Sequence, residues 1–181
     1  HPPLPVNEPV KDYAPGSPER AELEVALAEI ANNPVDLPHI IGGERVTGSG
    51  KKIDVVQPHA HAKVLGTLRD GTRADARKAI EKGADGLIAV AAGAGGHAGM
   101  QSPFALVQEI RSWFSGPLLL SGSLATGQAL LAAQVMGADL GYMGSAFIAT
   151  QEAQAPAEYK DMIVGSGAED IVTSSLFTGV S

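Results

Sequence analysis

One histidine stands inside a run of very small residues, and this part of the sequence is the best suited to chemistry. His97 lies in the segment from Gly93 to Gly99, which otherwise contains only glycine and alanine. A backbone with such small side chains can approach a flat or anionic ligand closely. We expect Gly95 and Gly96 to contact a bound cofactor in this way. Histidine readily exchanges protons near neutral pH. The segment predicts a ligand-binding loop with His97 as its catalytic residue, and the alternative interpretation is a solvated turn.

The element that must position this loop is the short apolar run directly before it. Residues 87–92 are apolar and are bounded by Asp85-Gly86 and by Gly93. This pattern is typical of a buried parallel strand. Because α/β enzymes place their chemistry at the carboxyl ends of such strands, we expect a functional site at this end.

Two further loops carry small residues directly after apolar runs. The first follows residues 118–120 and the second follows residues 139–143, and a predicted helix comes after each. Backbone N–H groups at the start of a helix attract anions, and barrels often bind a phosphate at their last strand–helix loops. We therefore expect a phosphate on these loops, although ordinary tight turns would have the same sequence. The expected phosphate-binding residues are Ser121, Gly122, Ser123, Gly144 and Ser145.

Strands and helices alternate through the second part of the chain. The predicted strands cover residues 87–92, 118–120, 139–143 and 171–174, and the predicted helices cover residues 74–82, 102–114, 124–136 and 156–164. Strands separated by helices of this length imply right-handed β-α-β units and a parallel sheet. Four such units are half of an eight-stranded barrel. The expected fold class is therefore α/β, with a partial (half) TIM-type β/α barrel of parallel strands.

The first part of the chain has a different pattern. Ser17-Pro18-Glu19 predicts a helix start, and Asn33-Pro34 predicts its end. Short β runs joined by tight turns follow between residues 39 and 68, and they favour antiparallel hairpins. His59 and His61 have no third ligand candidate nearby, so we interpret them as a solvated turn and expect no metal site. We expect a small α+β segment over residues 1–72 and the half barrel over residues 73–181.

Composition limits the classes of partner. The formal net charge of −7 argues against nucleic acid, because binding phosphates along a strand requires a positive surface. The absence of cysteine excludes disulfides and a cysteine nucleophile. No apolar run is long enough for a membrane span and no secretory signal is recognisable, so we expect a cytoplasmic protein without membrane contact.

The first part resembles the N-terminus of aldehyde dehydrogenases, above all the type that acts on pyrroline-carboxylate. The resemblance covers about residues 6–70 and rests on NEPVKDYAPGSPERAELEVALAEI, LPHIIGGERV and VVQPHAHAKVLGTL. In that family this region is a lead-in helix with antiparallel strands and carries none of the catalysis. The family's nucleophilic cysteine has no counterpart here, which excludes dehydrogenase activity by that mechanism.

The second part resembles nitronate monooxygenases, the family once called 2-nitropropane dioxygenases. The resemblance covers about residues 77–181 and rests on GADGLIAVAAGAGGHAG, SPFALVQEIR, GPLLLSGSLATGQALLAAQVMGADLGYMGSAFIAT and EYKDMIVGSGAEDIVTSSLFTGV. Only the carboxyl-terminal half of that family's barrel is matched. The two resemblances meet near residues 70–80, which indicates a chimaera.

The second resemblance implies a flavoprotein with FMN as cofactor. It implies that an alkyl nitronate is oxidised by O2 to a carbonyl compound and nitrite, with His97 near the nitro group as a base. The family often has a basic residue after the glycine that corresponds to Gly144, and its absence here weakens the expected grip on the phosphate. The alternatives are a non-catalytic α/β scaffold that binds at most a phosphate or flavin, and a flavin-dependent enoyl reductase that uses NAD(P)H. Because a half barrel exposes apolar strand surface, we expect homo-oligomers.

Overall fold

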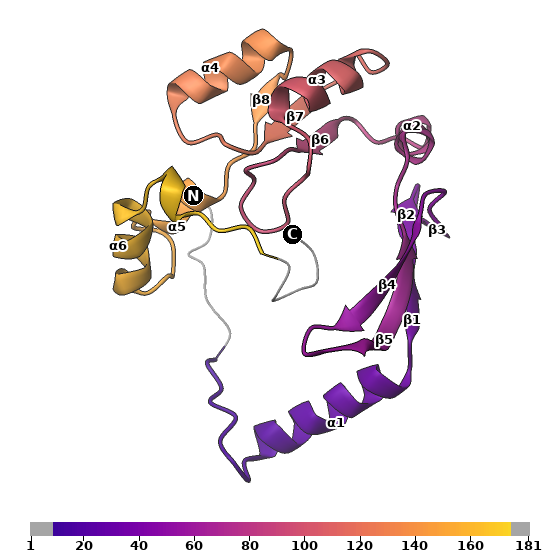
Figure 1. Ribbon diagram of the computed structural model, residues 1–181, viewed down its shortest axis with the longest axis vertical. Helices are drawn as coiled ribbons and strands as arrows, with labels where there is room; N and C mark the ends of the chain where they lie inside the picture. The colour runs from indigo at the N-terminus through magenta and orange to yellow at the C-terminus, as the bar shows by residue number, and fades with distance from the viewer. Residues whose placement is uncertain (1–8, 175–181) are drawn as a thin grey trace. The chain divides into compact units, whose positions relative to one another are not determined.

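The computed structural model describes residues 9–174 of the 181-residue chain (Figure 1). It divides into two compact units, and the division lies between Gly83 and Ala84. We call them the N-terminal unit and the C-terminal unit and describe each by itself.

The N-terminal unit begins with helix α1 (Pro18–Asn32), where the sequence predicts it. The Ser17 hydroxyl oxygen accepts a hydrogen bond from the Arg20 N–H at 3.2 Å, and Pro18 occupies the first helical position. Such a cap satisfies an N–H group that has no partner within the helix. No side chain of α1 is buried.

Two small sheets follow α1 and contain the predicted antiparallel hairpins. Strands β2 and β3 pair with each other, and β4 pairs with the long strand β5. The sequence missed β1, which pairs with β5 in parallel, so that the larger sheet has the order β1-β5-β4. A Cβ on Gly66 of β5 would lie 2.1 Å from the Val35 carbonyl oxygen, and glycine therefore permits this pairing. The strands are β1 (Val35–Leu37), β2 (His39–Ile41), β3 (Glu44–Val46), β4 (Lys52–Gln57) and β5 (Ala60–Arg69).

A capping box fixes the start of helix α2 (Arg73–Glu81), as the sequence predicts. The Asp75 carboxylate accepts hydrogen bonds from the hydroxyl of Ser49 at 2.7 Å and from the N–H of Thr72 at 2.8 Å. The Ser49 hydroxyl is the largest cause, and the Thr72 N–H the next, of a pKa of Asp75 far below its ordinary value. The carboxylate thus ties the loop between β3 and β4 to the start of α2.

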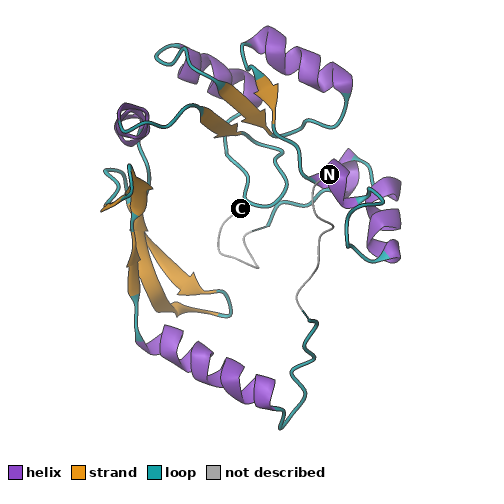
Figure 2. Cartoon of the chain, turned by 180° about the vertical axis from the view of Figure 1, so that it is seen from behind, coloured by secondary structure: helices purple, strands orange, loops and turns teal. Residues whose placement is uncertain are grey.

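The C-terminal unit is built on a parallel sheet of three strands in the order β6-β7-β8 (Figure 2). Helix α3 connects β6 to β7, and helix α4 connects β7 to β8. This alternation confirms an α/β fold with parallel strands. The elements are β6 (Leu87–Val90), α3 (Pro103–Arg111), β7 (Leu118–Ser121), α4 (Gly127–Met136), β8 (Leu140–Gly141), α5 (Ser145–Ile148), α6 (Ala157–Gly165) and a 3₁₀ turn, η1 (Ala168–Asp170).

The predicted fourth strand over residues 171–174 is wrong. This segment is irregular and follows η1, which contains Glu169 and Asp170. Ile171 and Val172 are 72% and 83% exposed, so the two apolar residues of the run bury little surface. A pair of apolar residues without a neighbouring strand gains too little from burial to hold an extended conformation. The described part of the unit therefore contains three strands, and the closure of a half barrel remains a prediction.

The core of the C-terminal unit lies on one face of its sheet. Leu118 and Leu120 of β7 are fully buried and belong to one apolar cluster with Val107 of α3 and Ala133 of α4. Both helices lie on the same side of the strands (Figure 1). At about 25 cal/mol per Å² of apolar surface removed from water, this face supplies the main stabilisation of the unit.

The opposite face of the sheet carries an apolar row that the described residues leave open. Ile88, Leu119 and Leu140 are register partners across β6, β7 and β8, so their side chains share a face. Ile88 is 54% exposed and Leu140 is 59% exposed. We refer to these three residues as the apolar row.

An arginine holds together the amino-terminal ends of β7 and β8. The Arg111 guanidinium donates to the carbonyl oxygens of Gly137 and Gly116, each at 2.7 Å. It also donates to the Asp139 carboxylate at 2.8 Å, which in turn accepts the N–H of Leu118 at 2.8 Å. The Leu118 N–H first, and then Arg111, lower the pKa of Asp139. Because these bonds join α3, α4 and two strands, they align the strands whose far ends carry the candidate site.

Candidate functional site

The loops after β6 and β7 cross at the carboxyl end of the sheet. The Ser123 N–H donates to the Gly93 carbonyl oxygen at 2.9 Å. Gly93 has a φ of +83°, and a Cβ there would lie 2.0 Å from the Ser123 hydroxyl oxygen. The contact therefore needs glycine at position 93 both for its backbone conformation and for space.

The loop after β8 reaches the same glycine segment. A Cβ on Gly95 would lie 2.7 Å from the Ser145 hydroxyl oxygen. On the side of β7, Gly122 is buried, and a Cβ there would lie 2.8 Å from the Ala92 carbonyl oxygen. The structure thus brings together Gly95, Gly122, Ser123 and Ser145, which the sequence places on three separate loops.

The backbone around His97 is free to contact a ligand. Among the described residues, the N–H groups of Gly95 and Gly96 donate to no other group. Gly96 has a φ of +78°, and a Cβ there would meet nothing within 4 Å. The imidazole of His97 is exposed and makes no hydrogen bond to the part of the chain that the structure describes. The loop therefore presents backbone donors and an imidazole to incoming molecules.

The helix that was predicted to begin directly after Ser123 begins further along the chain. Helix α4 begins at Gly127, and its N-terminal cap is Thr126, whose hydroxyl accepts the Ala129 N–H at 3.2 Å. Ser123 lies before this cap with a φ of +56°, and its N–H is occupied by Gly93. Because the backbone of Ser123 is left-handed, this residue turns toward the glycine loop and does not start the helix.

The remaining predicted residues lie at the same strand ends. Ser121 is the last residue of β7, is half-buried, and accepts the Ala91 N–H at 2.8 Å through its carbonyl oxygen. Gly144 directly precedes the single-turn helix α5, as the sequence predicts, and Ser145 is its first residue.

Two glycines of the loop were not among the predicted binding residues. Gly93 makes the contact with Ser123, and a Cβ on Gly99 would lie 2.0 Å from the Val90 carbonyl oxygen. Gly93 had a signal in the sequence, because it directly follows the predicted strand and such a glycine often marks a close backbone approach. The predicted strand over residues 139–143 is shorter in the structure, since Tyr142 lies just after β8 and is 54% exposed.

The three loops can hold a flat or anionic group through neutral donors. They contain neither lysine nor arginine, so an anion would be bound by N–H groups and by the hydroxyl of Ser145. Among the described residues, no group of three or more histidine, aspartate or glutamate side chains could hold a metal ion. No helix in the described ranges has the length and apolarity that crossing a bilayer requires.

Comparison with known proteins assigns the chain to a family. The family model of nitronate monooxygenase matches residues 30–181. The chain belongs to the nitronate monooxygenase family. The match includes the three loops of the site, and it extends to residue 30, beyond the motifs that begin near residue 77.

Individual relatives are similar to the chain over part of their length. A protein from Mycobacterium tuberculosis whose name describes it as a monooxygenase is 33% identical over 126 residues, which are 69% of this chain and 33% of that protein. A Staphylococcus aureus protein named as a probable nitronate monooxygenase is 33% identical over 131 residues, covering 66% of this chain and 36% of its own length. The chain therefore spans about a third of the length of these curated relatives.

Two solved structures add to this comparison. The structure of FabK from Thermotoga maritima is 25% identical and covers 89% of this chain and 49% of its own, with a TM-score of 0.52. The crystal structure of the Delta-pyrroline-5-carboxylate dehydrogenase from Mycobacterium tuberculosis is 59% identical over 44% of this chain and 15% of its own, with a TM-score of 0.41. The resemblance to nitronate monooxygenases is confirmed by the family model, and a similarity to a dehydrogenase is seen as well.

The crossing of Gly93 and Ser123 predicts unequal costs for two alanine substitutions. Gly93→Ala should lower the free energy of unfolding of the C-terminal unit by about 3 kcal/mol, because left-handed strain and a clash add together. Gly96→Ala is the matched control and should cost about 1 kcal/mol, because it has the strain without the clash. Urea unfolding followed by Trp113, the single tryptophan of the chain, measures both.

A double substitution tests the cause of the difference. Ser123→Ala should restore part of the stability lost in Gly93→Ala, because it removes the hydroxyl oxygen that the new Cβ meets. An equal loss of unfolding free energy in Gly93→Ala and Gly96→Ala, or no coupling between positions 93 and 123, would contradict the close contact between Gly93 and Ser123.

Proposed function

We propose that this chain is an FMN-dependent oxidoreductase that oxidises alkyl nitronates with O2 to a carbonyl compound and nitrite. The observation that carries the proposal is the convergence of three glycine- and serine-rich strand ends next to His97, in a chain of the nitronate monooxygenase family. We also propose that the β6-β7-β8 sheet is part of a half barrel, because its strands are parallel and helices cover one face.

The residues at the strand ends fit a flavin mononucleotide. Gly93, Gly95 and Gly122 let the three loops pack closely together, and Gly96 has open space beside it where a ligand can approach the backbone. The N–H groups of Gly95 and Gly96 and the hydroxyl of Ser145 would hold the ring and the phosphate. Bound FMN supplies the transfer of electrons from substrate to oxygen.

His97 would move the proton. Its imidazole is exposed on the glycine loop, so a small substrate can reach it. A neutral imidazole can accept the proton from the carbon next to the nitro group of a nitroalkane, and this step leaves the nitronate that is then oxidised. The glycines on both sides let the backbone follow the bound substrate closely.

A second candidate is a non-catalytic α/β scaffold that binds at most a phosphate or a flavin. The observation that favours it is that the three loops contain neither lysine nor arginine, so a bound phosphate would have no charge-assisted hydrogen bond from them.

Nitrite production from 1-nitropropane and from propyl nitronate tests the catalytic proposal. We expect the FMN-loaded chain to release nitrite from both. His97→Ala should reduce the rate with 1-nitropropane by at least about a hundredfold at equal FMN content, because a proton acceptor is lost, and should leave the rate with propyl nitronate unchanged, because that substrate has already lost the proton. His61→Ala, on β5 of the N-terminal unit, is the matched control and should keep the rate.

Other outcomes separate the alternatives. An FMN-loaded chain that releases no nitrite would favour the scaffold. Oxidation of NAD(P)H without nitronate would favour a reductase instead.

We further propose that copies of the chain associate through the apolar row. Its residues carry no charge, so two copies with a net charge of −7 can meet there without bringing like charges together. Light scattering during size-exclusion chromatography should give a mass above that of one chain. Leu140→Glu in the row should shift it to the mass of one chain, whereas Val135→Glu, at an exposed position of α4, should not. A monomeric mass for the unsubstituted chain would contradict this association.

A further inference from the structure

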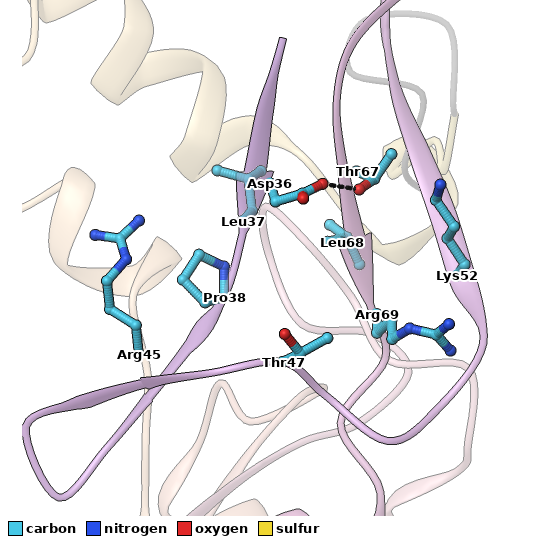
Figure 3. Close-up of a pocket in the computed structure, with 9 residues that line it drawn as sticks. All are labelled: Asp36, Leu37, Pro38, Arg45, Thr47, Lys52, Thr67, Leu68 and Arg69. Atoms are coloured by element: carbon cyan, nitrogen blue, oxygen red, sulfur yellow. Dashed lines mark hydrogen bonds between the residues drawn. The ribbon is translucent and has the colours of Figure 1, made fainter.

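The N-terminal unit contains a positively charged hollow outside the site described above. Its volume is about 390 Å³, within the range of small-molecule sites (Figure 3). The walls come from both small sheets of this unit and bring together three cationic side chains, one carboxylate, two threonines and three apolar residues. The lining residues are Asp36, Leu37, Pro38, Arg45, Thr47, Lys52, Thr67, Leu68 and Arg69.

Two of the cations belong to neighbouring residues of a strand pair. Lys52 of β4 and Arg69 of β5 are register partners in an antiparallel pair, so their side chains lie on the same face. Like charges in such a pair repel and destabilise the sheet. The Arg69 guanidinium donates to the Gly50 carbonyl oxygen at 3.1 Å, which leaves the repulsion in place. Within the described residues, neither side chain forms an ion pair, so an anion from outside would relieve an existing cost.

The third cation stands on the other side of the hollow. Figure 3 shows Arg45 on one side and Lys52 and Arg69 on the other, with Pro38 and Thr47 between them. Arg45 also forms no ion pair in the part of the chain that the structure describes. The hollow therefore has positive charge at two separated ends.

The middle of the hollow disfavours a negative charge on a ligand. The Asp36 carboxylate accepts a hydrogen bond from the Thr67 hydroxyl and adds negative charge between the two positive ends. Leu37, Pro38 and Leu68 supply apolar surface there. A ligand that matches this arrangement has an uncharged centre and an anionic group at each end.

We propose that this hollow binds an organic dianion in which two carboxylate or phosphate groups are joined by a short aliphatic spacer. One anionic group lies against Arg45, the other against Lys52 and Arg69, and the spacer lies on the apolar residues between them. Charge-assisted hydrogen bonds to guanidinium and ammonium groups give the recognition. The site belongs to the N-terminal unit and does not depend on the flavin proposal.

Isothermal titration calorimetry of the full chain at constant ionic strength tests this site, with adipate as the dicarboxylate and butane-1,4-diyl bisphosphate as the diphosphate. Hexanoate keeps the spacer but has one charge, and it should bind at least about tenfold more weakly than adipate. Whichever dianion binds more tightly identifies the anionic group that the site prefers.

Substitutions separate a site from general charge attraction. Arg45→Gln and Lys52→Gln should each weaken adipate binding at least about fivefold. Lys63→Gln changes a lysine of β5 outside the hollow and should leave binding unchanged. Without ligand, Lys52→Gln should keep or raise the melting temperature, because it removes the repulsion with Arg69, and this separates lost recognition from lost folding.

Four results would overturn the proposal. These are no binding by either dianion, equal binding of hexanoate and adipate, equal binding of inorganic phosphate and adipate, and equal weakening by Lys63→Gln and Lys52→Gln. The first result would mean that the hollow binds no dianion. The other three would mean, in this order, that binding depends on apolar contact, on a single compact anion or on diffuse positive charge.

Discussion

The hydrogen bond from the Ser123 N–H to the Gly93 carbonyl oxygen is the contact on which the candidate site depends. It joins the loops that leave two neighbouring parallel strands and holds the glycine segment over the end of the sheet. Any other residue at position 93 would be strained by the left-handed φ, and its Cβ would force the Ser123 hydroxyl to move. The Arg111 guanidinium aligns the strands at their other ends, so both ends of β7 are fixed by named contacts.

The sequence predicted regular elements well where local chemistry decides them. The capping serine before α1, the capping box of α2 and the glycine that ends α4 in a left-handed conformation all lie where the residue types indicate. These caps depend on neighbours within a few residues, which a sequence shows directly. The alternation of apolar runs and helices likewise indicated the parallel sheet.

Features that depend on distant partners were harder to predict. Strand β1 can pair with β5 because Gly66, about thirty residues later, leaves room for its backbone. No local sequence pattern indicates this pairing. The expected strand after η1 had the right residue types but no neighbour to pair with. Ser123 was expected to start a helix, yet its N–H is taken by a glycine on another loop. His97 was predicted as the catalytic residue from the glycines around it, and this role stays a prediction.

The two units use charge in different ways. The strand ends of the C-terminal unit offer neutral donors and close backbone approach, which suit a large flat ligand with a small charged part. The hollow of the N-terminal unit offers separated cations and little enclosure, which suit a small ligand with charged ends. The apolar row adds a third kind of surface, which gains stability only when something covers it.

Binding of FMN to the purified chain tests most directly whether the three strand ends form a flavin site. We expect protein that is incubated with FMN and then freed of unbound ligand to retain the visible absorption of flavin. We expect Gly95→Val, which fills the space beside the Ser145 hydroxyl, to lose this absorption while its far-UV circular dichroism stays unchanged. A folded but colourless unsubstituted protein, or a Gly95→Val variant that retains as much flavin as the original chain, would show that the strand ends form no flavin site.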